Sequence, residues 1–244
     1  MTGFTDIHSH FIYGMDDGPK KRAEMEAMID AAYADGITTL FATPHMTLGI
    51  RPFDSAVYNA RLSEARQYCL AMGYGMRLHR GAEILYTSAL SNYIADHSLP
   101  TLAKSRLVLI EFVPDISLRE IEEALELMER YGYVAMLAHI ERYACLRRGN
   151  QVRKIKERYN VRCQVNASSI LHPAGWLGEI AIKNWLKNRL ISAVACDAHD
   201  CVRRPYRMKA VYRVLAEWYG EAYASWLTGI RDGRNAHRHR SQGE

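Results

Sequence analysis

Short apolar runs and longer stretches with helical spacing alternate along this 244-residue chain. Apolar and β-branched runs of four to eight residues predict buried β-strands. The runs are TDIHSH, ITTLFATPH, MRLHRGAE, RLVLIEF, YVAMLAH, VRCQVNA and ISAVACDAH. Because helix-like segments separate the runs throughout, the pattern predicts a single distorted α/β barrel of seven parallel strands, not two domains.

The segments between the runs have helical periodicity. In the first of them the apolar residues are Met25, Met28, Ile29 and Ala32, and Gly36 marks its end. We expect further helices near residues 54–72, 88–94, 117–131, 151–159, 177–188 and 206–219.

Two of these predicted helices have recognisable first residues. Asp54 or Ser55 can cap the helix predicted near residues 54–72. Ser117, with Glu120 three residues later, forms a capping box at the start of the helix predicted near residues 117–131.

Six of the seven runs end in histidines or acids, which is the most informative feature of the chain. The residues are His8, His10, His45, Glu83, Glu111, His139, Asp197 and His199. The ends of parallel barrel strands meet at one mouth, so these side chains should converge there. Imidazoles and carboxylates bind divalent transition metals, which predicts a metal site at that mouth.

The evidence for metal binding is stronger for some of these residues than for others. Glu83 and Glu111 end apolar strands, where an acid is rarely buried without a partner, and a cation would offset the cost of desolvation. Asp17, in Asp16-Asp17-Gly18, could belong to a simple turn, and His45 could be an ordinary loop histidine. The agreement of six strand ends therefore carries more weight than any single residue.

Composition limits the remaining possibilities. Hydrophobic residues make up 48% and charged residues 24%, as in soluble globular proteins. No apolar run is long enough to span a membrane, and no signal peptide is evident. Five scattered cysteines without a CxxC pair favour a reducing cytosol over a disulfide framework.

The basic tail, residues 231–244, has four arginines and two acids and so carries +2 of the net charge of +5. We expect that tail to be frayed beyond a domain of residues 1–230, although a weak contact with anionic lipid or an acidic partner is an alternative. The sequence has no arginine and aromatic stripe typical of nucleic-acid binding. It also lacks the glycine-rich motifs GxxxxGK and GxGxxG.

Longer strings carry a resemblance to a known family. The motifs HSH, DDG, TPH, GAE, IEF, AHIERY, QVNASS and CDAHD occur in this order. Together they resemble the PHP superfamily, and more closely its bacterial metal-dependent protein tyrosine phosphatases (CpsB/YwqE-like), over about residues 6–220. The resemblance implies a distorted seven-stranded βα barrel with three metal ions of manganese, iron or zinc, with manganese favoured.

The resemblance also implies how the ligands are shared among the ions. His8, His10, Glu83 and Asp197 would bind the first ion; Glu83, Glu111 and His139 the second; Asp17, His45 and His199 the third. Cys196 stands where the family often has serine, and we interpret it as a buried structural thiol.

Phosphate binding is expected from arginines near the ligands. Arg142 and Arg204 match family positions thought to contact phosphate, with Arg203 as an alternative to Arg204. Cys201 and Arg207 fit the loose Cys-x5-Arg pattern of thiol-dependent phosphatases. That stretch has no glycine and contains Pro205, so it is a poor backbone cradle for phosphate.

The sequence thus predicts a metal-dependent protein tyrosine phosphatase that uses a metal-bridging hydroxide. The resemblance implies a substrate, the phosphotyrosine tail of a membrane-anchored bacterial kinase that controls capsular or exopolysaccharide synthesis. We expect a cytoplasmic protein that this kinase can recruit to the inner face of the membrane. Alternatives are a small-molecule phosphoesterase, such as a histidinol phosphatase, or a non-catalytic regulatory partner of the kinase.

Overall fold

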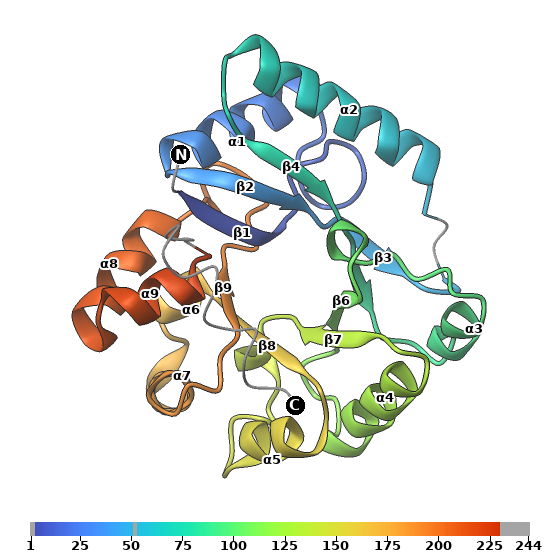
Figure 1. Cartoon of the computed structure of the whole chain (residues 1–244), viewed down its shortest axis with the longest axis vertical. Coiled ribbons are helices and arrows are strands. Elements are labelled where there is room, and N and C mark those ends of the chain that lie inside the picture. Colours follow the sequence, from blue (N-terminus) through green and yellow to red (C-terminus); the bar gives the residue numbers. More distant parts are fainter. Residues whose placement is uncertain (1–2, 51–52, 230–244) are drawn as a thin grey trace, which may run out of the picture.

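A ring of parallel strands surrounded by helices forms the molecule (Figure 1). This computed structural model describes residues 3–50 and 53–229. The strands are β1 (Phe4–Ser9), β2 (Ile37–Ala42), β3 (His45–Thr47), β4 (Arg77–Arg80), β5 (Glu83–Leu85), β6 (Leu107–Glu111), β7 (Val134–Leu137), β8 (Arg162–Asn166) and β9 (Ala193–Ala195). The predicted α/β class and its seven strand positions are confirmed.

Two of the predicted strands are interrupted. The second divides into β2 and β3 at Thr43-Pro44, and the third into β4 and β5 at Gly81-Ala82. Ala42 pairs with Arg80 and His45 with Glu83, so the register is the same on both sides of the gap. Pro44 has no N–H to donate, but its carbonyl oxygen accepts the Glu83 N–H at 3.1 Å. The two breaks therefore lie at the same level of adjacent strands and leave the pairing register unchanged.

The ring closes between β1 and the segment that follows β9. The Asp197 N–H donates to the His8 carbonyl at 2.9 Å, and the His10 N–H donates to the Ala198 carbonyl at 2.8 Å. The buried carboxylate of Asp6 also accepts the backbone N–H groups of His8 and Cys196. The hydrogen bonds that close the barrel thus lie beside predicted metal ligands.

Helices cover the outside of the ring (Figure 1). They are α1 (Arg22–Ala34), α2 (Ser55–Ala71), α3 (Leu90–Ala95), α4 (Leu118–Arg130), α5 (Gln151–Arg158), α6 (Ala167–Leu171), α7 (Gly175–Lys187), α8 (Met208–Tyr219) and α9 (Glu221–Leu227). Short 3-10 turns occur at η1 (Leu102–Lys104) and η2 (Ile140–Arg142). The short helices α6 and α9 were not predicted.

The helix signals of the sequence have their expected roles. The four apolar residues predicted for α1 are its buried residues. Asp54 caps α2 by accepting the N–H groups of Ala56 and Val57, and Ser117 forms the predicted capping box with Glu120. The tail predicted at residues 231–244 lies outside the described residues.

Apolar side chains fill the space between the helices and the ring, and a second set plugs the barrel itself. Leu102, Leu109, Met136 and Ala138 form this inner cluster, with Ile7 packed against it. The polar strand ends are therefore left at the opposite mouth of a packed barrel, as in βα barrels generally. Within residues 3–50 and 53–229, no helix combines the length and the apolar character that a membrane crossing requires.

Candidate metal centre

The structure brings all nine predicted ligands together at one mouth of the barrel. They come from β1 and the loop after it, from β3, β5 and β6, and from the loops that follow β7 and β9. These are His8, His10, Asp17, His45, Glu83, Glu111, His139, Asp197 and His199. Residues more than 180 positions apart in sequence thus share one site.

The first group, His8, His10, Glu83 and Asp197, has the membership that the resemblance implies. The two Nε2 atoms of His8 and His10 lie 3.1 Å apart. Glu83 Oε2 lies 3.1 and 3.3 Å from them, and Asp197 Oδ1 lies 3.4 Å from each. Four atoms bound tetrahedrally to one ion at about 2.0–2.2 Å would be about 3.3–3.6 Å apart. The spacing therefore fits a single cation at the centre of the four atoms.

Glu83 is the central carboxylate of the cluster. Burial would raise its pKa, but the charge of His8 and the close contacts with His10, His139 and His45 outweigh burial, so its pKa is well below the usual range. Its Oε2 atom is buried without a hydrogen bond, although His45 Nδ1 also lies only 3.0 Å away. A buried anionic oxygen surrounded by imidazole nitrogens in this way fits a bridging metal ligand.

The second group differs in detail from the predicted one. His45 Nδ1 lies 3.2 Å from Glu111 Oε1, which places His45 with Glu83 and Glu111. His139 Nε2 contacts Glu83 Oε1 at 2.7 Å and lies 3.6 Å from Glu111 Oε2. His45 and His139 thus both face the two carboxylates, whereas the resemblance implied only His139.

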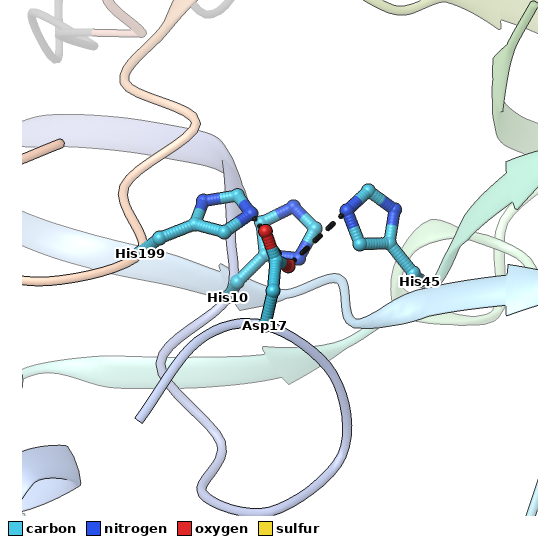
Figure 2. A group of neighbouring side chains, drawn as sticks. All are labelled: His10, Asp17, His45 and His199. Atoms are coloured by element: carbon cyan, nitrogen blue, oxygen red, sulfur yellow. Dashed lines mark ion pairs between the residues drawn. The ribbon is translucent and has the colours of Figure 1, made fainter. Parts of the chain in front are cut away.

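The third group contains Asp17, His45 and His199, and His10 lies with it (Figure 2). Asp17 Oδ1 is 3.1 Å from His199 Nε2 and 3.5 Å from His45 Nε2. The rings of His10 and His199 stack with centroids 3.8 Å apart. Asp17 is 63% exposed, so this is the open side of the centre.

The electrostatics of the histidines follow from this crowding. Burial lowers the pKa of His45, but its close contacts with the carboxylates of Glu111 and Glu83 outweigh burial and raise it to about 10. Burial and the neighbouring His10 lower the pKa of His199 to about 4. Five imidazoles and four carboxylates so close together are a donor set for several first-row transition metal ions.

Residues not predicted from the sequence hold the ligands in place. Asp16, and not only Asp17, acts in the DDG turn: its Oδ2 atom contacts His10 Nδ1 at 2.7 Å and accepts the His45 N–H at 2.9 Å. Gly18 completes the turn because a Cβ there would come within 2.2 Å of the His10 carbonyl oxygen. Such carboxylate–histidine contacts fix the ring orientation of metal ligands.

A second set of supporting hydrogen bonds comes from side chains of β8. Gln164 Oε1 lies 3.2 Å from His8 Nδ1 and accepts the His139 N–H at 2.8 Å. Gln164 Nε2 donates to Asn166 Oδ1, and Asn166 Nδ2 donates to Asp197 Oδ2 at 2.9 Å. The alternating polar positions in QVN were a signal for these contacts, since residues two apart share one face of a strand.

Two ligands have unusual backbone conformations. His139 has φ 30° and Asp197 has φ 53°, the left-handed region that residues other than glycine rarely adopt. Each stands two positions after the last residue of a short strand. Strain of this kind persists where the surrounding structure fixes a functional side chain.

Arg142 and Arg204 converge on one atom. Each donates from Nη2 to Asp197 Oδ2, at 2.8 and 2.7 Å, and Arg204 Nη1 is also 3.7 Å from Asp17 Oδ2. Their side chains are 42% and 37% exposed. Asp197 thus faces the histidines through Oδ1 and the arginines through Oδ2.

The cysteines near the site are not arranged for nucleophilic attack. Cys196 is buried and its Sγ accepts the Arg207 N–H at 3.3 Å, as expected of a structural thiol. Partial burial raises the pKa of Cys201, the opposite of what a thiolate nucleophile needs. Neither cysteine belongs to a ligand group found among residues 3–50 and 53–229.

Comparisons with known proteins identify the family of the chain. A family model described as capsular polysaccharide synthesis, CpsB/CapC, matches residues 4–232. The chain belongs to the CpsB/CapC family. It is 30% identical over 230 residues to the tyrosine-protein phosphatase CpsB of Streptococcus pneumoniae, covering 91% of this chain and 93% of that relative.

Comparison with solved structures shows similar folds. One matching structure comes from work on YwqE of Bacillus subtilis and CpsB of Streptococcus pneumoniae, described as metal-dependent tyrosine phosphatases. It has a TM-score of 0.83 and 26% identity, and the match covers 92% of this chain and 91% of the other. The phosphotriesterase homology protein of Escherichia coli has a TM-score of 0.53 at 11% identity, covering 93% and 96%, and shows the fold alone.

Proposed function

We propose that this CpsB/CapC family member is a metal-dependent protein tyrosine phosphatase, a phosphoric monoester hydrolase. The observation that carries the proposal is the nine-residue cluster of metal ligands with two arginines at its rim. Relatives that are named tyrosine-protein phosphatases match over nine-tenths of the chain. The thiol of Cys201 has no part in the reaction, because its raised pKa keeps it protonated at neutral pH.

The residues divide into those that hold metal and those that hold substrate. His8, His10, Glu83 and Asp197 would hold one ion, and Glu111, His139, Asp17, His45 and His199, with Glu83 shared, would hold two more. Metal ions bound there supply acidified water and neutralise charge on phosphate oxygens. Manganese is our preferred metal, ahead of iron and zinc.

Arg142 and Arg204 bind the phosphate of the substrate. Both guanidinium groups are partly exposed and already lie at the rim, on the Oδ2 side of Asp197. A guanidinium gives phosphate a planar, two-point contact and so orients it. Asn166 also donates to Oδ2, so Asp197 keeps a hydrogen bond when an arginine turns to the substrate.

The substrate that we propose is the phosphotyrosine tail of a membrane-anchored bacterial tyrosine kinase in capsular or exopolysaccharide synthesis. The reaction would take place in the cytoplasm, at the inner face of the membrane where such a kinase is anchored. Asp17, the open third group and the two arginines lie on the accessible side of the centre, which suits a side chain presented by a flexible peptide.

The test compares substrates and metal states of the purified full chain. Turnover is measured on a phosphotyrosine peptide, on a phosphoserine peptide and on histidinol phosphate, before and after chelation and with each metal restored. We expect a clear preference for the phosphotyrosine peptide and loss of turnover on chelation. A preference for histidinol phosphate would establish a small-molecule phosphoesterase instead, and no turnover by the metal-loaded protein would favour a non-catalytic role.

A further inference from the structure

A small basic cavity lies beside Asp197 and is not explained by metal binding. It has a volume of about 70 Å³, and its polar lining includes Arg142, Arg203, Arg204, Arg207, Asn166 and Ser168. Three of these residues are the donors to Asp197 Oδ2, and no metal-ligand histidine lines it. The arginine cavity, as we call it, is therefore on the side of Asp197 that faces away from its imidazole contacts.

The charges of the arginine cavity do not balance. Four arginines and a single carboxylate, that of Asp197, are among the residues that line it. Arg142 and Arg204 are paired with it, but neither Arg203 nor Arg207 forms an ion pair with any residue in the described ranges 3–50 and 53–229. Like charges held together in this way repel one another, and an anion entering the cavity would relieve the repulsion.

The loop that carries three of the arginines is firmly anchored. Asp200 Oδ1 accepts the Val202 and Arg203 N–H groups at 2.6 and 2.5 Å, and the Arg204 carbonyl accepts the His199 N–H at 3.0 Å. Further along, buried Tyr206 shares a 2.6 Å hydrogen bond with Ser9 of β1. The guanidinium groups are thus presented from a preorganised segment, which reduces the entropic cost of binding.

We propose that the arginine cavity is a second anion subsite, which takes a phosphate dianion next to the phosphate that is hydrolysed. Arg142 and Arg204 are paired with Asp197 and assigned to the hydrolysed phosphate, so Arg203 and Arg207 would supply the two positive charges for the second dianion. The ligand is either a second phosphorylated side chain of the same peptide or free inorganic phosphate. The proposal rests on the proposed function and gives the basic Cys-x5-Arg loop a role in binding substrate.

The experiment uses two peptides, one with a single phosphotyrosine and one with a second phosphotyrosine nearby. The ratio of their kcat/KM values is measured for the metal-loaded wild type and for Arg203→Ala and Arg207→Ala. Arg213→Ala, an exposed arginine of α8 outside the cavity, is the matched control. We expect the wild type and the control to prefer the doubly phosphorylated peptide, and each cavity variant to lose roughly ten-fold of that preference, about the value of one charge-assisted hydrogen bond.

Inhibition by inorganic phosphate separates the two sources of the anion. If the wild type does not distinguish the peptides but phosphate inhibits Arg203→Ala and Arg207→Ala less than the control, free phosphate is the occupant. If peptide preference and phosphate inhibition are the same in all four proteins, the subsite does not exist. Arg203→Gln and Arg207→Gln, which keep most of the side chain, replace any alanine variant that melts at a lower temperature than the wild type.

Failure of the proposed function would be recognised separately. A wild type that hydrolyses neither peptide would refute the phosphatase, and calorimetric titration with inorganic phosphate would still test the cavity. Binding that Arg203→Ala and Arg207→Ala both weaken by roughly ten-fold would support the subsite. Equal binding by the wild type and both variants would overturn it.

Discussion

Replacing Arg142 by alanine tests how the centre handles phosphate. The side chain is 42% exposed, so truncation leaves no sealed cavity. Asp197 Oδ2 also keeps two donors, Arg204 at 2.7 Å and Asn166 at 2.9 Å, so its charge is not left unpaired. We therefore expect Arg142→Ala to fold and to retain its metal.

The expected loss is in catalytic efficiency. One charge-assisted hydrogen bond is worth about 1.5–3 kcal/mol, or about a ten- to hundred-fold fall in kcat/KM on a phosphotyrosine peptide. Inorganic phosphate should inhibit the variant less than the wild type. Arg142→Lys should restore only part of the activity, because an ammonium group cannot form the planar two-point contact.

The assay combines steady-state kinetics, phosphate inhibition and metal analysis of the same samples. Arg148→Ala, an exposed arginine in the same loop, controls for loss of charge alone. Normal kinetics and normal phosphate inhibition in Arg142→Ala would refute the reasoning. Loss of metal from the variant would instead show that Arg142 supports Asp197 as a ligand.

Three further predictions follow from the centre and its surroundings. Elemental analysis of gently purified protein should give more than one transition-metal equivalent per chain, and a repeatable value near zero with full activity in chelator would contradict the centre. Metal binding at pH 7 should release protons, because the raised pKa values of His10 and His45 keep both rings protonated without metal, and metal affinity should therefore rise with pH. The check is calorimetry in buffers of different ionisation enthalpy. A binding heat that is the same in every buffer would contradict the prediction. Cys201→Ser should turn over within a few-fold of wild type, and an inactive variant that is folded and metal-loaded would restore the thiolate mechanism.

The sequence predicted the fold well because each strand and helix carries a local signal. Apolar runs located all seven strand positions, and the four apolar residues of α1 are the ones it buries. The helices α6 and α9 were missed because they are only five and seven residues long, too short for periodicity to be clear. The breaks at Thr43-Pro44 and Gly81-Ala82 were also missed, because the apolar runs continue through both positions.

The site was predicted at the level of membership but not of geometry. Spacing along a strand can place His8 and His10 on one face, yet it cannot show that His45 reaches both Glu83 and Asp17. Asp16 could not be separated from Asp17, because two adjacent aspartates in a turn look alike until the turn is folded. In the folded turn Asp16 contacts the His10 ring and the His45 N–H, whereas Asp17 faces His199 and His45 Nε2.

Closure of the barrel and assembly of the centre depend on the same contacts. The bonds between His8 and Asp197 and between His10 and Ala198 join the first and last strand positions, and they involve three ligands. A slip of one residue there would turn side chains to the opposite face, since strand residues alternate. Asp6 opposes such a slip, because its buried carboxylate accepts N–H groups from both sides of the junction. The ligands that lie furthest apart in sequence are therefore held in register by the bonds that complete the fold, and the first metal group forms only when the barrel has closed.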